Sequence, residues 1–175
     1  YLPSNTTWDP DVLTGFGGSI SWKPKGVNDD YIAFSEASNG TDFWHIDYNG
    51  ELWISNDYQF ADLNMYGGAP WHPYRQHIKT LKIENGVYRI GNLSFYELTK
   101  LQKADLGNVT QIGNYAFEYC SALTDVEMGD SVNSIGKCAF YGCTALEEVY
   151  IPYVPNLQVS DYAFGNCTNL RKACI

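Results

Sequence analysis

The side chains with the greatest chemical reactivity are five cysteines and three histidines, and each set occupies its own part of the 175-residue chain. Three cysteines, Cys120, Cys143 and Cys167, recur at intervals of 23 and 24 residues. Thiols in such a row could bind a metal or form a disulfide, but the chain has no C-x-x-C pair of the kind that structural zinc sites use. Because Leu98 fills the preceding position of the series, we interpret the three cysteines as small buried residues with weak S–H donors.

The histidines and carboxylates do not form a catalytic pattern. His45, His72 and His77 lack the spacing of a helical metal pair, and no neighbouring serine or cysteine lies in a nucleophile-elbow context. The chain has 20 acidic residues, so the number of carboxylates alone leaves a glycosidase-like pair open. We expect residues such as Asp125 and Glu127 to be solvated, however, where nothing would raise the pKa of a carboxyl group. We therefore predict a protein that is not an enzyme and needs neither metal nor cofactor.

The tryptophans suggest a different kind of chemistry, the stacking of aromatic rings on sugars. All five lie at or before Trp71. We interpret Trp44 and Trp71 as core residues. Trp8 and Trp22 are the candidates for glycan contact, so a carbohydrate-binding module that uses N-terminal tryptophans and tyrosines is the alternative function.

An internal repeat must position these residues in the second half of the chain. The spacing from Ile to Phe is always five residues, and from Phe to the next apolar strand always six, so length varies only in the turns between. Such a pattern predicts a solenoid with one coil per repeat, whose short strands form a parallel sheet. The L-x-x-V-x-I strands begin 23, 22, 23 and 24 residues apart, at Ile78, Leu101, Leu123, Leu146 and Leu170.

Alternation along each strand predicts which side chains face outward. Val126 and Met128 point inward, so Asp125 and Glu127 point to the concave face of the sheet. Equivalent positions in the neighbouring coils make the candidate binding residues Lys103, Asp105, Asp125, Glu127, Glu148 and Tyr150. We further expect a helical turn in each coil to carry a phenylalanine inward. The resulting structural ladder comprises Phe95, Phe117, Phe140 and Phe164, beside Cys120, Cys143 and Cys167.

A β-hairpin is predicted just before the repeats. Asn49-Gly50, a strong two-residue turn signal, separates 43–48 from 51–55, and the apolar residues of both segments alternate onto one face. We interpret residues 43–77 as a hairpin cap that covers the first coil. Residues 1–42 form a β-rich segment of unclear role, and residues 78–175 form an array of four to five coils.

The segments IGNYAFEYCSALTDVEM (112–128) and IGKCAFYGCTALEEVYI (135–151) resemble the BspA-type leucine-rich repeat. Residues 44–78 are similar to the segment that often precedes such arrays. The resemblance implies a right-handed leucine-rich-repeat solenoid with short parallel strands, helical turns and a β-rich N-terminal cap. It also implies a bacterial, secreted or cell-surface protein with an adhesin-like function, binding host matrix proteins or the surfaces of other bacteria.

Charge and hydropathy exclude two classes of partner. The net charge of −9 and a pI near 4.6 argue against nucleic acid and against a polybasic membrane anchor. The apolar runs are far shorter than the roughly 20 residues of a transmembrane helix. We expect an extracellular protein whose export signal or anchor has been removed, a protein partner, and self-association through an open C-terminal coil.

Overall fold

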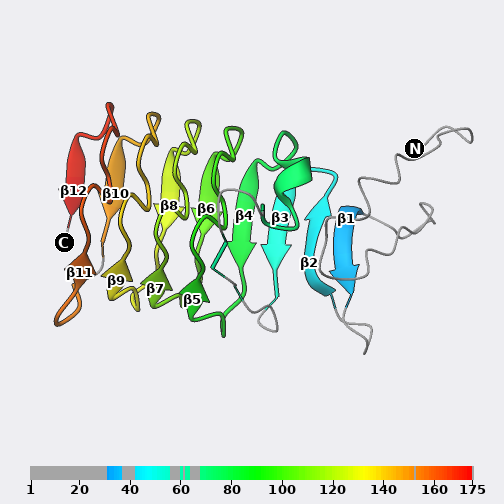
Figure 1. Ribbon diagram of the computed structural model, residues 1–175, viewed down its shortest axis with the longest axis horizontal. Helices are drawn as coiled ribbons and strands as arrows, with labels where there is room; N and C mark the ends of the chain where they lie inside the picture. Colours follow the sequence, from blue (N-terminus) through cyan, green and yellow to red (C-terminus); the bar gives the residue numbers. More distant parts are fainter. Residues whose placement is uncertain are drawn as a thin grey trace, which may run out of the picture.

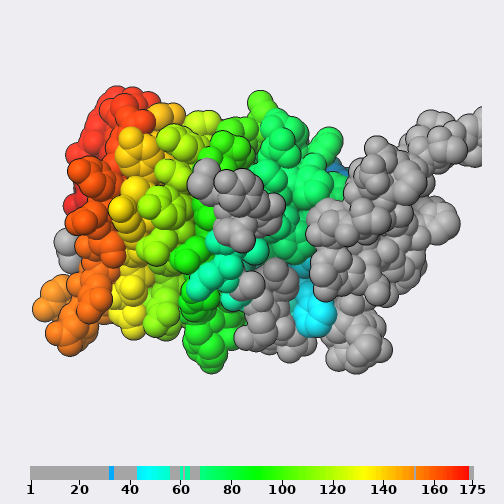
Figure 2. Space-filling model, viewed as in Figure 1, coloured from blue at the N-terminus to red at the C-terminus, as the bar shows by residue number. Residues whose placement is uncertain are grey.

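The computed structural model describes residues 31–36, 42–55, 60, 62–63, 68–151 and 153–174. Trp8 and Trp22, and most of the predicted 1–42 segment, lie outside these residues. The described chain is a β-solenoid of about four turns whose strands form two rows along the long axis (Figure 1). In the space-filling view the coils appear as successive bands that touch one another from the first repeats to the last (Figure 2).

The main sheet joins the hairpin to the repeats. The first three strands pair antiparallel, and every later pairing is parallel, beginning with β3 on β4. A separate parallel pair, β10 and β12, continues the same row in Figure 1. In order, the strands of the main sheet are β1 (Tyr31–Glu36), β2 (Asp42–Asp47), β3 (Glu51–Ile54), β4 (Thr80–Ile83), β6 (Lys103–Asp105) and β8 (Asp125–Glu127), and the pair is β10 (Glu148–Tyr150) with β12 (Lys172–Cys174).

The second row consists of two-residue parallel strands that precede each turn. They are β5 (Arg89–Ile90), β7 (Gln111–Ile112), β9 (Ser134–Ile135) and β11 (Gln158–Val159). The single helical element among the described residues is the 3₁₀ turn η1 (His72–Tyr74). It lies before the first repeat strand.

The predicted helical turns are therefore wrong, and hydrogen bonding explains why. The amide of Phe95 donates to the carbonyl of Ala116 at 2.8 Å, so it bonds to the next coil rather than to a residue four positions back. The amide of Phe117 does the same to Ala139 at 2.7 Å. Leu93 also has φ +58°, which a right-handed helix does not accommodate. The turns belong to the solenoid's ladder of coil-to-coil bonds.

Stacked aromatic rings run through the core along the solenoid axis. Centroid distances are 4.9 Å from Phe95 to Phe117, 5.0 Å from Phe117 to Phe140 and 5.2 Å from Phe140 to Phe164. Trp71 stacks on Phe95 at 5.4 Å, so it begins the ladder where a preceding coil would place a phenylalanine. The first three phenylalanines are completely buried. Burial of each such ring contributes about 2–3 kcal/mol to folding.

The hairpin residues predicted to share one face are all buried. The exposed fraction is at most 1% for each of the four, Trp44, Ile46, Leu52 and Ile54.

 β3 then pairs with β4 in parallel, with Leu52 opposite Leu81 and Ile54 opposite Ile83. The hairpin thus continues the sheet and the core of the repeats without a break. The division into an N-terminal segment, a cap and an array stays a prediction.

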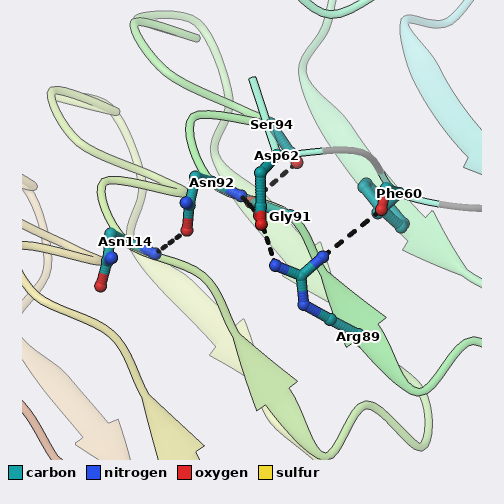
Figure 3. A network of polar contacts seen from close by, with 7 residues as sticks. All are labelled: Phe60, Asp62, Arg89, Gly91, Asn92, Ser94 and Asn114. Atoms are coloured by element: carbon teal, nitrogen blue, oxygen red, sulfur yellow. Dashed lines mark hydrogen bonds and ion pairs between the residues drawn. The ribbon is translucent and has the colours of Figure 1, made fainter. Parts of the chain in front are cut away.

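A polar ladder ties the segment before the repeats to the first coils (Figure 3). The Asp62 carboxylate pairs with Arg89 and accepts the amide N–H of Asn92 at 3.0 Å. The side-chain oxygen of Asn92 accepts the amide N–H of Asn114 at 2.7 Å, and that of Asn114 accepts the amide N–H of Lys137 at 2.8 Å. Asp62 therefore occupies the place that an asparagine occupies in the coils that follow.

The glycines of two Ile-Gly pairs, Gly113 and Gly136, allow the coils to approach this closely. A Cβ atom on Gly113 would lie 2.6 Å from the carbonyl carbon of Gly91. A Cβ atom on Gly136 would lie 2.7 Å from the amide nitrogen of Asn114. Both distances are to backbone atoms, which cannot move aside, so these two coils require glycine at a position where the last coil has Ser160.

Candidate functional site

The outward side chains of β4, β6, β8, β10 and β12 form a broad surface, which we call the open sheet face. Val126 and Met128 are buried as predicted, while Glu127 and Glu148 are exposed and Asp105 and Asp125 are partly exposed. Lys103 is exposed as well, and Tyr150 is 60% exposed. The predicted binding residues of the sheet therefore share one face.

Ion pairs between neighbouring strands order part of this face. Lys103 Nζ lies 3.6 Å from Asp125 Oδ2, and Lys172 Nζ lies 3.6 Å from Glu148 Oε2. The parallel register places each pair directly opposite. All four side chains are about half or more exposed, so each pair contributes at most about 1 kcal/mol to stability.

Two further carboxylates, one on β6 and one on β8, face each other across the sheet. Asp105 lies opposite Glu127 in the register of β6 and β8, and opposite Lys82 in the register of β4 and β6. Asp105 Oδ1 accepts a local bond from the amide of Gly107 at 3.0 Å. Like charges directly opposite in a sheet repel, so a cationic group that docks between them would relieve that repulsion.

The hollows on the open sheet face are wide and open to solvent. One of about 510 Å³ lies between β8 and β10 and is lined by Glu127, Glu148 and Tyr150 among others. Others, of about 370 and 210 Å³, lie along β4 and β6, with Lys82 and Asp105 in the lining of both. Shapes of this kind suit a broad macromolecular surface better than a small molecule, which binds in an enclosed cleft.

The cysteine ladder is built for structure rather than reactivity. The thiol of Cys120 donates to the carbonyl of Phe95 at 3.1 Å, that of Cys143 to Phe117 at 3.3 Å, and that of Cys167 to Phe140 at 3.1 Å. Burial raises the pKa of all three thiols. They remain protonated near neutral pH, and a protonated thiol is neither a good nucleophile nor a good metal ligand.

The three histidines lie in different surroundings. His45 stacks on Trp53 with 4.9 Å between ring centroids, and burial lowers its pKa against the opposing charge of Asp47. His72 lies in η1, and burial also lowers its pKa. His77 is exposed. In the described part of the chain, no group of three or more His, Cys, Asp or Glu side chains is placed to hold a metal ion.

A second set of residues, of which Tyr119 is exposed and the other four are partly exposed, was not found from the sequence. It lies in the turns, and we call it the tyrosine–glutamate edge: Tyr96, Glu97, Glu118, Tyr119 and Tyr141. The ring centroids of Tyr96 and Tyr119 are 6.2 Å apart, and those of Tyr119 and Tyr141 are 5.8 Å apart, both in edge-to-face contact. The only signal in the sequence is that each residue follows a ladder phenylalanine by one or two positions.

The parallel strands, the stacked coils and the outward-facing charged residues define a leucine-rich-repeat solenoid. The model of the BspA type leucine rich repeat region matches residues 74–175 in six copies, and the chain belongs to this family. No curated protein matches the chain. Within the described residues, no helix has the length and apolar character needed to cross a membrane.

Two solved structures share the fold. A leucine-rich cell surface protein from Faecalibacterium prausnitzii is 22% identical, with a TM-score of 0.54 over 87% of this chain and 43% of that one. A leucine-rich repeat protein from Eubacterium ventriosum is 19% identical, with a TM-score of 0.57 over 74% of this chain and 40% of that one. The chain thus spans less than half the length of either protein.

Proposed function

We propose that this chain is a non-catalytic interaction module of a secreted or cell-surface bacterial protein, and that its open sheet face binds a protein partner in an adhesin-like role. The observation that carries the proposal is the face itself, where charged and aromatic side chains stand on a rigid sheet around wide hollows. A surface held by a stacked core loses little conformational entropy when it binds.

Membership of the family supports a binding function, because leucine-rich-repeat surface proteins are generally not enzymes. The cell-surface description of the Faecalibacterium prausnitzii protein supports the same location for this one. The partners that we propose are host matrix proteins or proteins on other bacteria. Repeat solenoids present extended surfaces of the kind that such partners require.

Tyr150 provides the sharpest test, since exposed tyrosines often dominate binding energy when a partner covers them. We expect Tyr150→Ala to weaken capture of the chain by immobilised matrix proteins by at least about fivefold. The matched control is Tyr88→Ala, because Tyr88 is 67% exposed but precedes β5 in the other row of strands. Equal binding by both variants and the wild type would contradict a role for the open sheet face.

Carbohydrate binding through Trp8 and Trp22 remains the alternative, and it concerns residues outside the described part of the chain. A glycan array probed with the wild type and with the Trp8→Ala/Trp22→Ala double variant tests it. Binding that the double variant loses would favour this alternative over a protein partner. Self-association through the last coil also stays a prediction, for which light scattering across a concentration series is the measurement.

A further inference from the structure

The tyrosine–glutamate edge spans three consecutive coils, with Tyr119 exposed and its neighbours partly exposed. The ring of Tyr119 lies over Gly142 of the next coil, where a Cβ atom would be 2.7 Å from the ring. The ring of Tyr141 lies over Gly165 in the same way, again at 2.7 Å. Tyr119 and Tyr141 therefore each pack on a glycine, where a larger residue would displace the ring. The rings follow one another along the solenoid axis.

Two carboxylates accompany these rings. The amide of Glu97 donates to the carbonyl of Glu118 at 2.9 Å, so the two residues are neighbours on adjacent coils. Burial and the charge of Glu97 together raise the pKa of Glu118. Neither carboxylate forms an ion pair with a lysine, arginine or histidine among the described residues. The negative charge at this edge is therefore not neutralised by a described side chain.

Nearby His72 does not change this charge balance. The charge of Glu97 acts to raise the pKa of His72, but burial and the charge of Arg75 lower it, and lowering prevails. Near neutral pH the imidazole is uncharged. Arg75 itself donates to the carbonyl of His72 at 3.3 Å.

Two residues of the edge lie in the left-handed backbone region. Glu97 has φ +55° and Tyr119 has φ +60°, a conformation that glycine adopts most readily. The equivalent position of the next coil is Gly142, with φ +73°. The same conformation occurs in other coils, at Leu93, Tyr115, Cys138, Tyr162 and Asn166, so it belongs to the geometry of the repeat.

We propose that the tyrosine–glutamate edge binds the arginine side chains of an extended basic segment of a protein partner. Guanidinium groups pack on tyrosine rings and pair with carboxylates through fixed, planar geometry. Alternate residues of an extended chain are about 6.6 Å apart. The tyrosine rings are 6.2 and 5.8 Å apart, so a segment lying along the solenoid would present one arginine to each coil.

This surface is separate from the open sheet face, and none of its five residues lines the three hollows described there. The proposal adds a second contact to the function proposed above and does not depend on it. A negative result for the edge variants would not bear on the role proposed for Tyr150. A negative result for Tyr150→Ala would likewise not bear on the edge.

The probe is a fluorescein-labelled octapeptide of alternating arginine and serine, titrated with the full chain and followed by fluorescence anisotropy. The variant is Glu97→Gln/Glu118→Gln, which we expect to weaken binding about tenfold. The matched control is Glu147→Gln/Asp161→Asn, which removes two exposed carboxylates that belong neither to the edge nor to the hollows of the open sheet face, and is expected to change binding less than about twofold. Thermal unfolding of each variant confirms that it is folded.

Tyr119→Leu tests the aromatic part of the surface, with an expected loss of about three- to fivefold. Equal losses in the two double variants would overturn the proposal, because they would show attraction to net charge alone. An unchanged affinity in Glu97→Gln/Glu118→Gln would also overturn it. So would binding of a neutral oligosaccharide that Tyr119→Leu abolishes and the glutamine variant retains, which would make the edge a carbohydrate site.

Discussion

The carboxylate of Asp62 accepts the amide N–H of Asn92 at 3.0 Å, although thirty residues separate the two in the chain. Asn92 offers its own side-chain oxygen to Asn114 in the same geometry. A residue outside the repeats thus supplies the acceptor that a preceding coil would otherwise supply. The relationship explains how residues 62–63 are held on the array.

Asp62 should contribute stability that depends on pH. The amide of Asn92 and the Arg89 guanidinium lower the pKa of Asp62 below its ordinary value of 3.8. A lowered pKa in the folded state gives stability that is present above 3.8 and is lost as the pH falls through the folded-state pKa. We therefore expect Asp62→Ala to lower the melting temperature by about 2 °C at pH 7 and by less at pH 3.

Asp62→Asn is the control for this comparison, because it keeps a side-chain oxygen and removes the charge. It should retain part of the stability at pH 7 and show no titration in the acidic range. Calorimetry of the three proteins between pH 3 and pH 7 makes the measurement. A difference between Asp62→Ala and the wild type that is constant over this range would contradict the assigned role.

Phe117 should be among the most costly residues to truncate. It is fully buried, and its ring stacks on both Phe95 and Phe140. Phe117→Ala is expected to destabilise the fold by about 3–5 kcal/mol, through lost burial and the cavity left between two coils. Urea unfolding measures this loss, and Tyr88→Ala, at an exposed position, should change stability by less than about 0.5 kcal/mol.

Glu97→Gly should make the protein more stable. The substitution removes a left-handed conformation that costs about 1–2 kcal/mol for a residue with a Cβ atom, against about 0.5–1 kcal/mol for the added freedom of glycine when unfolded. It also removes the repulsion between Glu97 and Glu118. We expect a net gain of about 0.5–1 kcal/mol in urea unfolding.

The control for this gain is Glu147→Gly, at an exposed residue without a positive φ. There the substitution should destabilise the protein by about 0.5–1 kcal/mol. Opposite signs for the two variants are the expected result. A loss of stability in both would show that the conformation of Glu97 carries no strain.

The cysteine ladder should be protected from alkylation in the folded protein. Burial raises the pKa of Cys120 and Cys143, and both thiols donate to backbone carbonyls of the preceding coil. At pH 8 we expect iodoacetamide to modify these two residues only after denaturation, while the half-buried Cys167 reacts sooner. Peptide mass spectrometry over time gives the three rates separately, and rapid labelling of Cys143 would contradict its burial.

Periodicity in the sequence was sufficient to predict the solenoid. Once Phe95, Phe117 and Phe140 recur with constant spacing inside each coil, their stacking follows from the geometry of the repeat, because equivalent residues of adjacent coils must be neighbours. The same reasoning predicts that Val126 is buried and Glu127 exposed. Both are observed.

Several features depended on contacts that no local pattern reveals. The turns resemble helical segments in sequence, yet their amides bond to the next coil, as Phe95 does to Ala116. Asp62 is a single acidic residue whose role arises only because its segment lies beside Asn92. The tyrosine–glutamate edge combines residues from positions whose residue type changes from one coil to the next.

The sequence by itself therefore determined the coil, its core and the outward side of its strands, because each of these repeats with the chain. Tertiary structure alone decided how the hairpin joins the first coil and which irregular residues meet at the surface. Leu52 lies opposite Leu81 because β3 pairs in parallel with β4, and Tyr119 meets Tyr96 because stacking brings residues 23 positions apart within ring contact. Such contacts depend on register between coils, which is a property of the folded chain.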